Sequence, residues 1–538
     1  MRNLSLAQSV VAHCIEAGSL HAVVSPGSRN TPVVLALHEA AKAKRLTIHV
    51  VLDERSAAFL ALGLCRASFS PVILSCTSGS AGAHYLPALA EARELGLPLV
   101  AITADRPVEL QGRGAPQTMP QETLFGDLVR TSVTLEPGQP LPNLMKQAQG
   151  PQRGPVHYNL RFRKPLWGDF EWPEWPECAP DVPERTAPSS AFRRAVAGAR
   201  RGLIVVGPRE RSPDGRGETA LIRFAEQAGW PVLSEPASDV CSPLVPFGAE
   251  AFLRREQPPG EPDLILRVGR SPTAGPTSKF LKRWGAGKTW LIEPSGRLLD
   301  GECIDPFVEE CSVEAALEGL STAPAEPGWL EAWLEAGRLA RASFEAGSPD
   351  TLWAGTVVRA VWSALSSSDD LHVASSMAIR NLCSFAELGQ EGPCVSANRG
   401  LNGIDGTIAC AVGQARCSSR PMTVMLGDLA FLHDQASLAL VGAANLRIVV
   451  LDNGGGAIFE HLPIAGQTEV FERYFLTPQD ADIGAIARAH GLAVDRIGKV
   501  SELESALEKP GPRVLHVVMD RGQDFAMHQA YWSAVRGE

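Results

Sequence analysis

Runs of apolar residues alternate with amphipathic stretches along the first third of the chain. Short runs rich in Val, Ile and Leu predict strands, and the longer stretches between them, such as residues 56–68, have the periodicity of helices. Because strands that lack polar alternation are buried on both faces, this order indicates a parallel sheet covered by helices. The strands expected here lie at residues 21–26, 46–54, 71–79 and 97–107.

The same alternation returns in two further blocks, which are bounded by proline-rich segments. Five prolines between residues 173 and 188, and the segment STAPAEPG at 321–328, predict linkers. The pattern therefore predicts an α/β protein with three doubly wound parallel-sheet domains over residues 1–172, 190–325 and 345–538. The later strands are expected at 201–208, 230–236, 263–269, 289–295, 371–377, 394–400, 422–428, 446–459 and 512–520, with a long helix near 432–444.

Composition narrows the class of protein further. Hydrophobic residues make up 45% of the 538 residues, and no run approaches the roughly 20 apolar residues that span a bilayer, so no membrane partner is expected. The eleven cysteines occur singly, without a C-x-x-C pair, and the N-terminus does not read as a signal peptide, which is typical of a cytoplasmic protein. The net charge of −10 argues against a nucleic-acid partner. An anionic ligand must therefore be met by local basic residues.

A carboxylate follows an apolar strand in the segment PMTVMLGDLAFLHDQ, residues 421–435. Ligands of open parallel sheets bind beyond the carboxyl ends of the strands, and Asp428 stands at such an end. One crossover later the next strand ends at Asn453, before a run of glycines, and adjacent strands would bring both residues to one ion. Carboxylate, amide and carbonyl oxygens suit Mg²⁺, and glycines let the backbone approach phosphates. A turn or helix-cap role is the alternative explanation of these residues.

Several segments of the chain resemble a known family. GDLAFLHD followed by LDNGGGAIF is similar to the metal–diphosphate motif of thiamine diphosphate (ThDP) enzymes, and HVVLDERSAAFLALG resembles the segment that carries their conserved glutamate. More narrowly, SPGSRNTPVVLAL, DERSAAFLALGL, TSGSAGAHYLPALAEA, ITADRPVELQGRGAPQTMPQETLFG, SANRGLNGIDG and GDLAFLHD resemble the 2-succinyl-5-enolpyruvyl-6-hydroxy-3-cyclohexene-1-carboxylate (SEPHCHC) synthase family, the MenD family of menaquinone biosynthesis. The resemblance covers the first 126 residues and much of 370–465, whereas the middle block matches weakly, mainly through GPTSKFLKRW.

The resemblance implies ThDP as the cofactor, with Mg²⁺ or Mn²⁺. Glu54 would hydrogen-bond the aminopyrimidine and promote its imino tautomer, whose nitrogen takes the thiazolium C2 proton. From the residues alone, Glu54 could instead be a first-turn acid that complements the helix dipole.

The resemblance also implies the ligands of the metal and the contacts of the cofactor. Asp428, Asn453 and the carbonyl of Gly455 are the expected metal ligands, and Asp452 with Gly454 is the alternative register. The remaining implied cofactor contacts are Ser376, Leu429, Ile458, Phe459 and Ile404, the last of which would prop the bent cofactor or simply pack in the core.

The substrates implied by the resemblance, 2-oxoglutarate and isochorismate, together carry four carboxylates. Arginine recognises carboxylates in a bidentate manner, although any one basic residue alone is more often a solvated charge. Pro116 and Phe280 stand where some members have Asn and Arg, which bears on the exact isochorismate contacts and not on the reaction class. The matching residues are Ser28, Arg29, Arg106, Gln117, Lys279, Ser376, Arg380 and Arg399, of which Arg29, Gln117, Ser376, Arg380 and Arg399 join Glu54 as expected catalytic residues.

The implied reaction is decarboxylation of 2-oxoglutarate and conjugate addition of the resulting four-carbon carbanion to isochorismate, which gives SEPHCHC. Because ThDP enzymes usually build sites between subunits, a homodimer or homotetramer is expected. One alternative is another ThDP enzyme with a monocarboxylate donor, and another is a silent binding protein that kept the fold. A nucleotide-binding middle domain is disfavoured because GLIVVGPRERSPDG lacks the G-x-G-x-x-G fingerprint.

Overall fold

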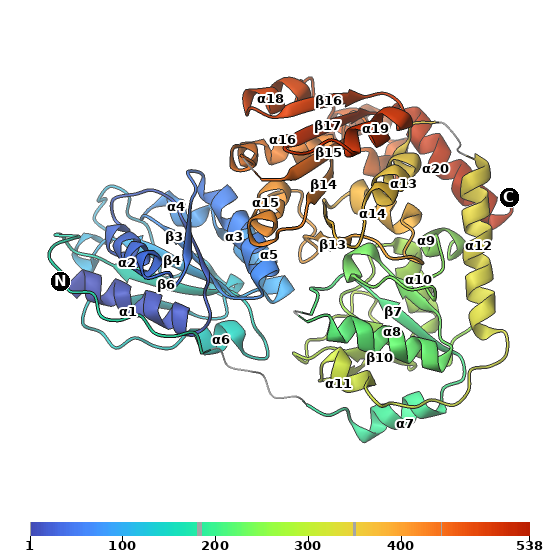
Figure 1. Ribbon diagram of the computed structural model, residues 1–538, viewed down its shortest axis with the longest axis horizontal. Helices are drawn as coiled ribbons and strands as arrows, with labels where there is room; N and C mark the ends of the chain where they lie inside the picture. Colours follow the sequence, from blue (N-terminus) through green and yellow to red (C-terminus); the bar gives the residue numbers. More distant parts are fainter. Residues whose placement is uncertain (1, 180–185, 213, 348–350, 443) are drawn as a thin grey trace. The chain divides into compact units, whose positions relative to one another are not determined.

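The structure, a computed structural model, describes residues 2–179, 186–212, 214–347, 351–442 and 444–538 (Figure 1). Within these residues the strands form three sheets, and every recorded strand pair is parallel. Helices alternate with the strands, so the predicted α/β fold with three parallel sheets is confirmed. The chain divides into two compact units. The first unit contains Met1–Glu184, Asp405–Ser419 and Asp434–Ala444, and the second contains Arg185–Ile404, Arg420–His433 and Asn445–Glu538.

The first sheet has the strand order β2-β1-β3-β4-β6-β5. Its central strands are short apolar runs in which every residue is buried, as expected for strands covered on both faces. The four strands predicted in this region are confirmed. The bounds are β1 His21–Val24, β2 Thr47–Val50, β3 Val72–Cys76, β4 Leu99–Asp105, β5 Ser132–Leu135 and β6 Val156–Arg161.

Helices from the first 95 residues of the chain cover this sheet. Helices α1 (Arg2–Glu16) and α2 (Thr31–Lys42) lie side by side and share an apolar core with the strands (Figure 1). Helix α3 (Glu54–Ser68) contacts β1, β3 and β4 and packs on α5 (Leu86–Leu95).

A helix from a distant part of the sequence completes the first unit. Helix α15 (Thr407–Cys417) packs so closely on α3 that a Cβ atom at Gly63 would lie 1.9 Å from the carbonyl oxygen of Cys410. A Cβ atom at Gly413 would likewise lie 2.2 Å from the carbonyl oxygen of Leu60. Both positions require glycine because no side chain fits between the two backbones.

The central sheet belongs to the second unit and has the order β11-β10-β9-β7-β8. A charged residue in its core is Arg267 on β9, which is 1% exposed and lies 3.1 Å from Glu302 and 3.6 Å from Asp300. Helix α10 (Gly275–Trp284) follows β9. The strand bounds are β7 Gly202–Val206, β8 Val232–Ser234, β9 Leu264–Val268, β10 Thr289–Ile292 and β11 Phe307–Glu309.

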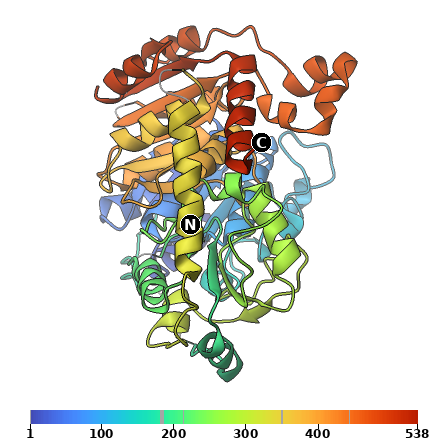
Figure 2. The same ribbon diagram turned by 90° about the vertical axis from the view of Figure 1, so that its right-hand side faces the viewer.

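The third sheet has the order β13-β12-β14-β15-β17-β16, which repeats the order of the first sheet strand for strand. Helices α12 (Trp329–Gly347) and α20 (Arg521–Arg536) pack side by side in this unit, in yellow and red in Figure 2. Helix α14 (Met377–Phe385) follows β12. The strand bounds are β12 Asp370–Val373, β13 Cys394–Ala397, β14 Met422–Gly427, β15 Leu446–Asp452, β16 Ala493–Ile497 and β17 Arg513–Val518.

The prediction of a long helix near residues 432–444 is wrong. Helix α16 (Asp428–His433) ends directly before Asp434, and a 3-10 helix over Gln435–Leu440 follows. Asp434 leaves the helix because its buried carboxylate accepts the N–H of Ile408 at 2.8 Å, in the first turn of α15. This residue therefore caps another helix instead of continuing its own.

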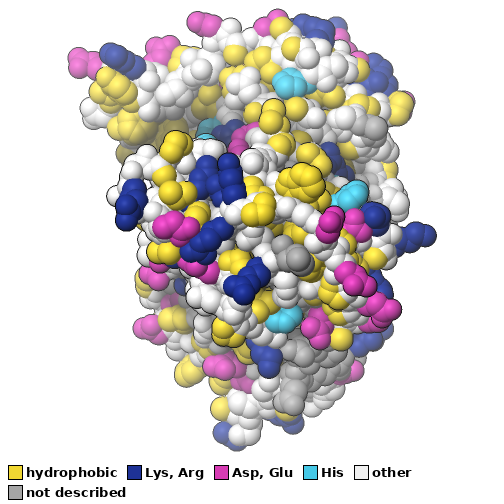
Figure 3. All heavy atoms as spheres, turned by 90° about the vertical axis from the view of Figure 1, so that its left-hand side faces the viewer, with side chains coloured by type: hydrophobic (Ala, Val, Ile, Leu, Met, Phe, Trp, Pro, Cys, Tyr) yellow, Lys and Arg dark blue, Asp and Glu magenta, His cyan; other side chains and the backbone are white. Residues whose placement is uncertain are grey.

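The first expected linker contains no regular structure where it is described. Residues 180–185 lie outside the described residues, and 173–179 and 186–188 form neither helix nor strand. None of the described helices is both long and apolar enough to cross a membrane. The face drawn in Figure 3 carries Lys and Arg side chains close to Asp, Glu and hydrophobic ones.

Candidate active site

Two arginines meet at the carboxyl end of the first sheet. Arg29 follows β1 and Arg106 follows β4, and burial together with the positive charge of Arg106 lowers the pKa of Arg29. Arg29 is 7% exposed, and its Nη1 donates to the carbonyl oxygen of Phe162 at 2.7 Å. Among the described residues its buried Nε has no hydrogen-bond partner. A buried donor of this kind is suited to an anionic ligand.

The Arg106 side chain is held by the loops beside it. Its Nη1 donates to Oγ of Ser78 at 2.9 Å, and its Nη2 donates to Oε1 of Gln117 at 3.2 Å. Gln117 has a φ of 54°, in the left-handed region that residues other than glycine rarely adopt and that is common at functional sites. The structure thus brings Arg29, Arg106 and Gln117 into one cluster. Ser28 is exposed next to Arg29.

Glu54 is the first residue of α3, at the carboxyl end of β2. Asp53 caps this helix, because its carboxylate accepts the N–H groups of Arg55 and Ser56, each at 3.3 Å. The Ser56 hydroxyl donates to Asp53 at 2.6 Å and lies 3.0 Å from the hydroxyl of Ser437. Hydrogen bonds on two sides therefore fix the position from which the Glu54 side chain begins.

Two carboxylates lie at the carboxyl ends of β14 and β15 in the second unit. The expected adjacency of these strands is confirmed. Asp428 is 5% exposed, and burial followed by the charge of Asp452 raises its pKa to about 7. The backbone N–H groups of Leu429 and Gly455 hydrogen-bond its carboxylate. A buried carboxylate whose charge is disfavoured in this way is a ready ligand for a cation.

The Asp452 carboxylate has partners of its own. Its Oδ2 lies 2.7 Å from Nε2 of His516 on β17, and its Oδ1 accepts the N–H of Gly454 at 3.2 Å. The hydrogen bond from His516 lowers the pKa of Asp452. Asn453 follows at the same strand end. Among the described residues no three His, Cys, Asp or Glu side chains are grouped to hold a metal, so a cation here would also need amide, carbonyl or phosphate oxygens.

The glycines after β15 form a tight turn. Gly454 and Gly455 have φ values of 75° and 128°, and a Cβ atom at Gly455 would lie 2.2 Å from the carbonyl oxygen of Leu476. Phe459 packs edge to face on Phe475 with ring centroids 5.5 Å apart. The turn is thus pressed against the segment 472–476, and only glycine allows this approach. The predicted cofactor contacts Leu429 and Ile458 are half-buried.

A second basic group lies in the second unit. Arg399 follows β13 and is 9% exposed, and its positive charge opposes the rise that burial causes in the pKa of Glu235. Arg380 on α14 donates from Nη1 to the carbonyl oxygen of Ser376 at 2.8 Å. Ser376 has a φ of 68°, so a second predicted site residue carries a strained backbone. Burial raises the pKa of the Cys383 thiol, and the positive charges of both arginines oppose that rise.

The other predicted positions are more dispersed. Lys279 is exposed on α10, whereas Phe280 is 5% exposed and packs edge to face on Trp333 at 5.8 Å. Phe280 is therefore a core residue of the central region. Pro116 is exposed beside Gln117, and Ile404 is half-buried.

Sequence reasoning missed the buried polar residues beneath the arginine cluster. Asp105, Gln121 and Asn159 are at most 1% exposed. The Asn159 amide donates to Asp105, and the Gln121 amide donates to Asn159 and to the backbone carbonyl before Asp105. The pattern that pointed to Asp428, a carboxylate at the end of an apolar strand, is equally present at Asp105. Asp434 was missed as well, because nothing local marks its contact with α15.

In comparison with known proteins, the N-terminal and C-terminal parts of the chain each match a protein family. Residues 4–124 match the family described as thiamine pyrophosphate enzyme, N-terminal TPP binding domain, and residues 382–517 match the corresponding C-terminal TPP binding domain. These matches contain Glu54 in the first case and Asp428 with Gly455 in the second.

Curated relatives match over almost their whole length. The relatives are named 2-succinyl-5-enolpyruvyl-6-hydroxy-3-cyclohexene-1-carboxylate synthase. The relative from Sorangium cellulosum is 35% identical to this chain, over 98% of this chain and 95% of the relative. The relative from Rubrobacter xylanophilus is 37% identical over 94% of both chains, and that from Saccharopolyspora erythraea 36% over 99% and 98%. Because these matches span all three sheets, this chain is an enzyme that belongs to the SEPHCHC synthase family of thiamine diphosphate-dependent enzymes.

Proposed function

We propose that this enzyme decarboxylates 2-oxoglutarate and adds the resulting four-carbon fragment to isochorismate, giving SEPHCHC for menaquinone biosynthesis. The names of the curated relatives support this reaction. The observation that carries the proposal is that Arg29 and Arg106 hydrogen-bond to adjacent residues, Thr77 and Ser78, in one partly buried cluster. Two guanidinium groups suit a substrate with several carboxylates, whereas a monocarboxylate donor would leave one positive charge without a partner.

The end of the third sheet fits a metal ion bound to a diphosphate. The neighbours that shift the pKa of the buried Asp428 are a carboxylate and backbone N–H groups, and the turn at Gly454–Gly455 forms a backbone cradle. We propose Mg²⁺ or Mn²⁺ on Asp428, Asn453 and the carbonyl of Gly455. Asn453 is preferred to Asp452 because the Asp452 carboxylate is already hydrogen-bonded to His516. The remaining proposed cofactor contacts are Ser376, Ile404, Leu429, Ile458 and Phe459.

ThDP, when bound, supplies the carbon nucleophile and holds the electron pair left by departing CO₂. The part of this chain is to position that group and to move its proton. Glu54 stands at the start of α3, which Asp53 caps, and would hydrogen-bond the aminopyrimidine nitrogen and set its tautomer. Proton transfer at this position therefore needs no histidine base.

The basic residues hold two anions in attack geometry in a chain whose net charge is −10. Arg29, Arg106 and Gln117 form one binding group. The second group comprises Ser376, Arg380 and Arg399. Ser28, next to Arg29, and Lys279 on α10 are proposed as further contacts, and both are exposed.

The assembly is proposed from the family. We infer an aminopyrimidine-binding domain over 1–172, a central domain over 190–325 and a diphosphate-binding domain over 345–538. A homodimer or homotetramer with sites between subunits, located in the cytoplasm, completes the proposal.

The test is an assay of the purified protein with ThDP, Mg²⁺, 2-oxoglutarate and isochorismate, in which CO₂ release and isochorismate loss are followed together. Glu54→Gln is the matched variant, because it keeps the side-chain shape and removes the acid. Coupled loss of both substrates that disappears in the variant supports the proposal. Decarboxylation of pyruvate and not of 2-oxoglutarate would overturn the substrate assignment while retaining the cofactor.

A further inference from the structure

The first and third sheets contain the same side-chain arrangement at the end of their fourth strand. Both sheets have the order 2-1-3-4-6-5, and β4 and β15 occupy the same place in it. In the first sheet Asp105 ends β4 and its Oδ2 accepts from Asn159 at 3.0 Å. In the third sheet Asp452 ends β15 and its Oδ2 lies 2.7 Å from His516.

The register shows that these pairs are equivalent. Asp105 pairs with Arg161, and its partner Asn159 is two residues before that position on β6. Asp452 pairs with Val518, and its partner His516 is two residues before that position on β17. In each sheet the aspartate also accepts a backbone N–H of the loop that follows, from Arg106 at 2.7 Å or Gly454 at 3.2 Å.

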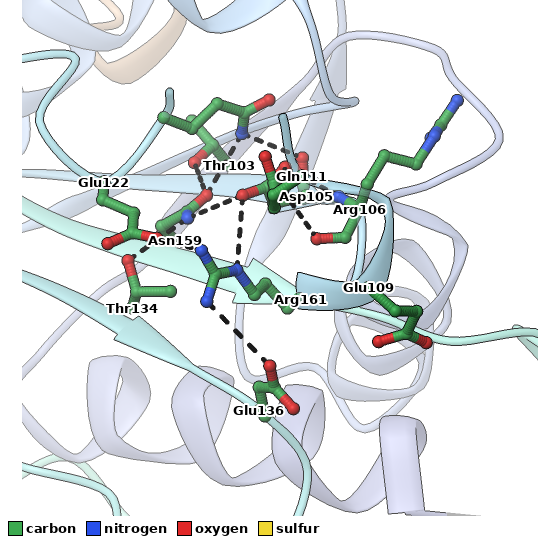
Figure 4. Close-up of polar contacts among 12 residues, drawn as sticks. Thr103, Asp105, Arg106, Glu109, Gln111, Glu122, Thr134, Glu136, Asn159 and Arg161 are labelled. Carbon is green, nitrogen blue, oxygen red and sulfur yellow. Dashed lines mark hydrogen bonds and ion pairs between the residues drawn. The ribbon is translucent and has the colours of Figure 1, made fainter. Parts of the chain in front are cut away.

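The environment of Asp105 requires a carboxylate. The side chain is fully buried, and every partner approaches it as a donor (Figure 4). An amide at this position would aim an N–H₂ group at another donor, which leaves a buried polar group unsatisfied. The partners are the Arg106 N–H at 2.7 Å, Gln111 Nε2 at 3.1 Å, Asn159 Nδ2 at 3.0 Å and, as an ion pair, Arg161 Nε at 3.8 Å.

These contacts fix the backbone of Arg106 from both sides. Asp105 accepts its N–H, and Gln111, itself bound to Asp105, donates Nε2 to its carbonyl oxygen at 3.0 Å. In Figure 4 the Arg106 side chain extends away from the carboxylate. Its guanidinium therefore starts from an immobilised residue and reaches Ser78 and Gln117. The nearby negative charge also offsets repulsion between Arg29 and Arg106.

The buried amide of Gln121 ties the rest of the cluster to the same support. Its Oε1 accepts the N–H of Gly79 at 2.8 Å, next to Ser78, and its Nε2 donates to Oδ1 of Asn159 at 3.1 Å. The loop that holds the Arg106 guanidinium and the strand that holds its backbone thus share one hydrogen-bonded network.

From this geometry we propose that Asp105 is the positioning residue of Arg106, and that it sets the affinity of the enzyme for the anionic substrate that Arg106 binds. The inference rests on the proposed function. Asp105 does not touch substrate; it acts through the arginine, as Asp452 acts on the turn beside the metal-binding residues.

The test compares Asp105→Asn with Arg106→Lys in steady-state kinetics, with each substrate varied in turn. Arg106→Lys identifies the substrate that the arginine binds. Asp105→Asn is expected to raise the KM of that same substrate about tenfold, with the KM of the other substrate and the ThDP affinity unchanged. A merely structural role would affect both substrates and the cofactor together.

A reciprocal exchange sharpens the result. Asp105→Asn combined with Asn159→Asp restores an acceptor to every hydrogen-bond donor at these two positions, while the ion pair between position 105 and Arg161 is lost. The new carboxylate at position 159 would accept from the new amide at position 105 and from the present donors Thr103 and Gln121. The double variant is expected to return the KM to within roughly threefold of the parent value. Glu109→Gln is the matched control, since this exposed carboxylate of the same loop pairs with Arg163 and not with Arg106.

A variant outside the core keeps the test sound if Asp105→Asn does not fold. Gln111 is half-buried, and Gln111→Leu removes the bond to the Arg106 carbonyl, which is expected to raise the same KM roughly threefold. An active parent whose Asp105→Asn and Gln111→Leu variants keep that KM would overturn this inference alone. A parent that turns over neither substrate would overturn the proposed function and this inference with it.

Discussion

The first and third sheets share one strand order, but the charged side chains at the carboxyl ends of their strands differ. At the end of the first sheet stand Arg29 and Arg106, whereas at the end of the third stand Asp428 and Asp452. The shared topology fixes where loops converge, and the side chains at the strand ends then decide which ligand is attracted. The ends of β1 and β4 suit carboxylate substrates, and the ends of β14 and β15 suit a cation.

The difference also extends to how each charge is compensated. The buried carboxylate of Asp105 accepts the N–H of Arg106 and the amide of Asn159, so an anion lies next to the positive edge. Asp428 has backbone N–H groups and a second carboxylate as neighbours, and burial raises its pKa to about 7. The arginines of the first edge therefore have a counter-charge within the chain, whereas at the second edge the charge of one carboxylate raises the pKa of the other.

The largest expected effect comes from removing the charge at the negative edge. Asp428→Asn should lower kcat about 1000-fold, because a bound metal contributes several kcal/mol through the diphosphate that it holds. ThDP binding in the presence of Mg²⁺, measured by calorimetry, should weaken in parallel. Asp480→Asn, an exposed residue of the same unit, is the control. Unchanged ThDP affinity in Asp428→Asn would contradict a cation-binding site at this edge.

A smaller effect is expected at the positive edge. Arg29→Lys should raise the KM of one substrate between 10- and 100-fold, roughly 1 to 3 kcal/mol, because lysine cannot reproduce the bidentate geometry. Its ThDP affinity should stay within about twofold, since the arginine belongs to the anion-binding edge. Equal losses of substrate and cofactor affinity would contradict the division of labour between the two sheets.

The response of the protein to acid should depend on a buried histidine of the first sheet. Burial lowers the pKa of His157 on β6 to about 3, so the folded state keeps this imidazole neutral while the unfolded chain binds a proton near pH 6.5. Stability is then lost as the pH falls below 6.5, by up to about 1.4 kcal/mol per pH unit. Thermal unfolding at pH 6.5 and 5.5 should show a smaller shift for His157→Gln than for the parent. A variant with the parent's full shift would assign the acid sensitivity to other groups.

The smallest effect is expected where two helices of the first unit meet. Ser437→Ala removes the hydroxyl that bonds Asp434 at 2.7 Å and lies beside Ser56, and should cost about 1 kcal/mol. The melting temperature should fall by a few degrees. The effect on kcat should be larger than the effect on KM, because the start of α3 carries Glu54. The exposed Ser505 on α19 (Val500–Leu507), whose hydroxyl bonds only its own helix, serves as the control when replaced by alanine. A lower melting temperature with unaltered kcat would limit Ser437 to a structural role.

Much of this arrangement could be predicted because its signals are local. The apolar runs marked the strands, and Asp428 and Asn453 were placed on neighbouring strands from their spacing and the rule of sequential pairing. Arg29 and Arg106 were identified through the family resemblance. Their proximity follows from β1 and β4 ending at the same edge of one sheet.

The remainder depends on contacts between distant segments. Nothing near Asn159 in the sequence marks it as the partner of Asp105, because that contact arises only when β4 and β6 pair. The helix expected near 432–444 failed for the same reason, since Asp434 caps α15 rather than extending α16. Local propensity was overridden there by tertiary hydrogen bonds.

The glycines that join α3 to α15 limit how genes of this family could be recombined. Gly63 and Gly413 are encoded far apart, yet each leaves room for the other helix's backbone. A crossover placed anywhere between their codons would unite an α3 from one parent with an α15 from another. Chimeras that inherit residues 54–68 and 405–417 from the same parent are therefore the ones in which this helix pair stays matched.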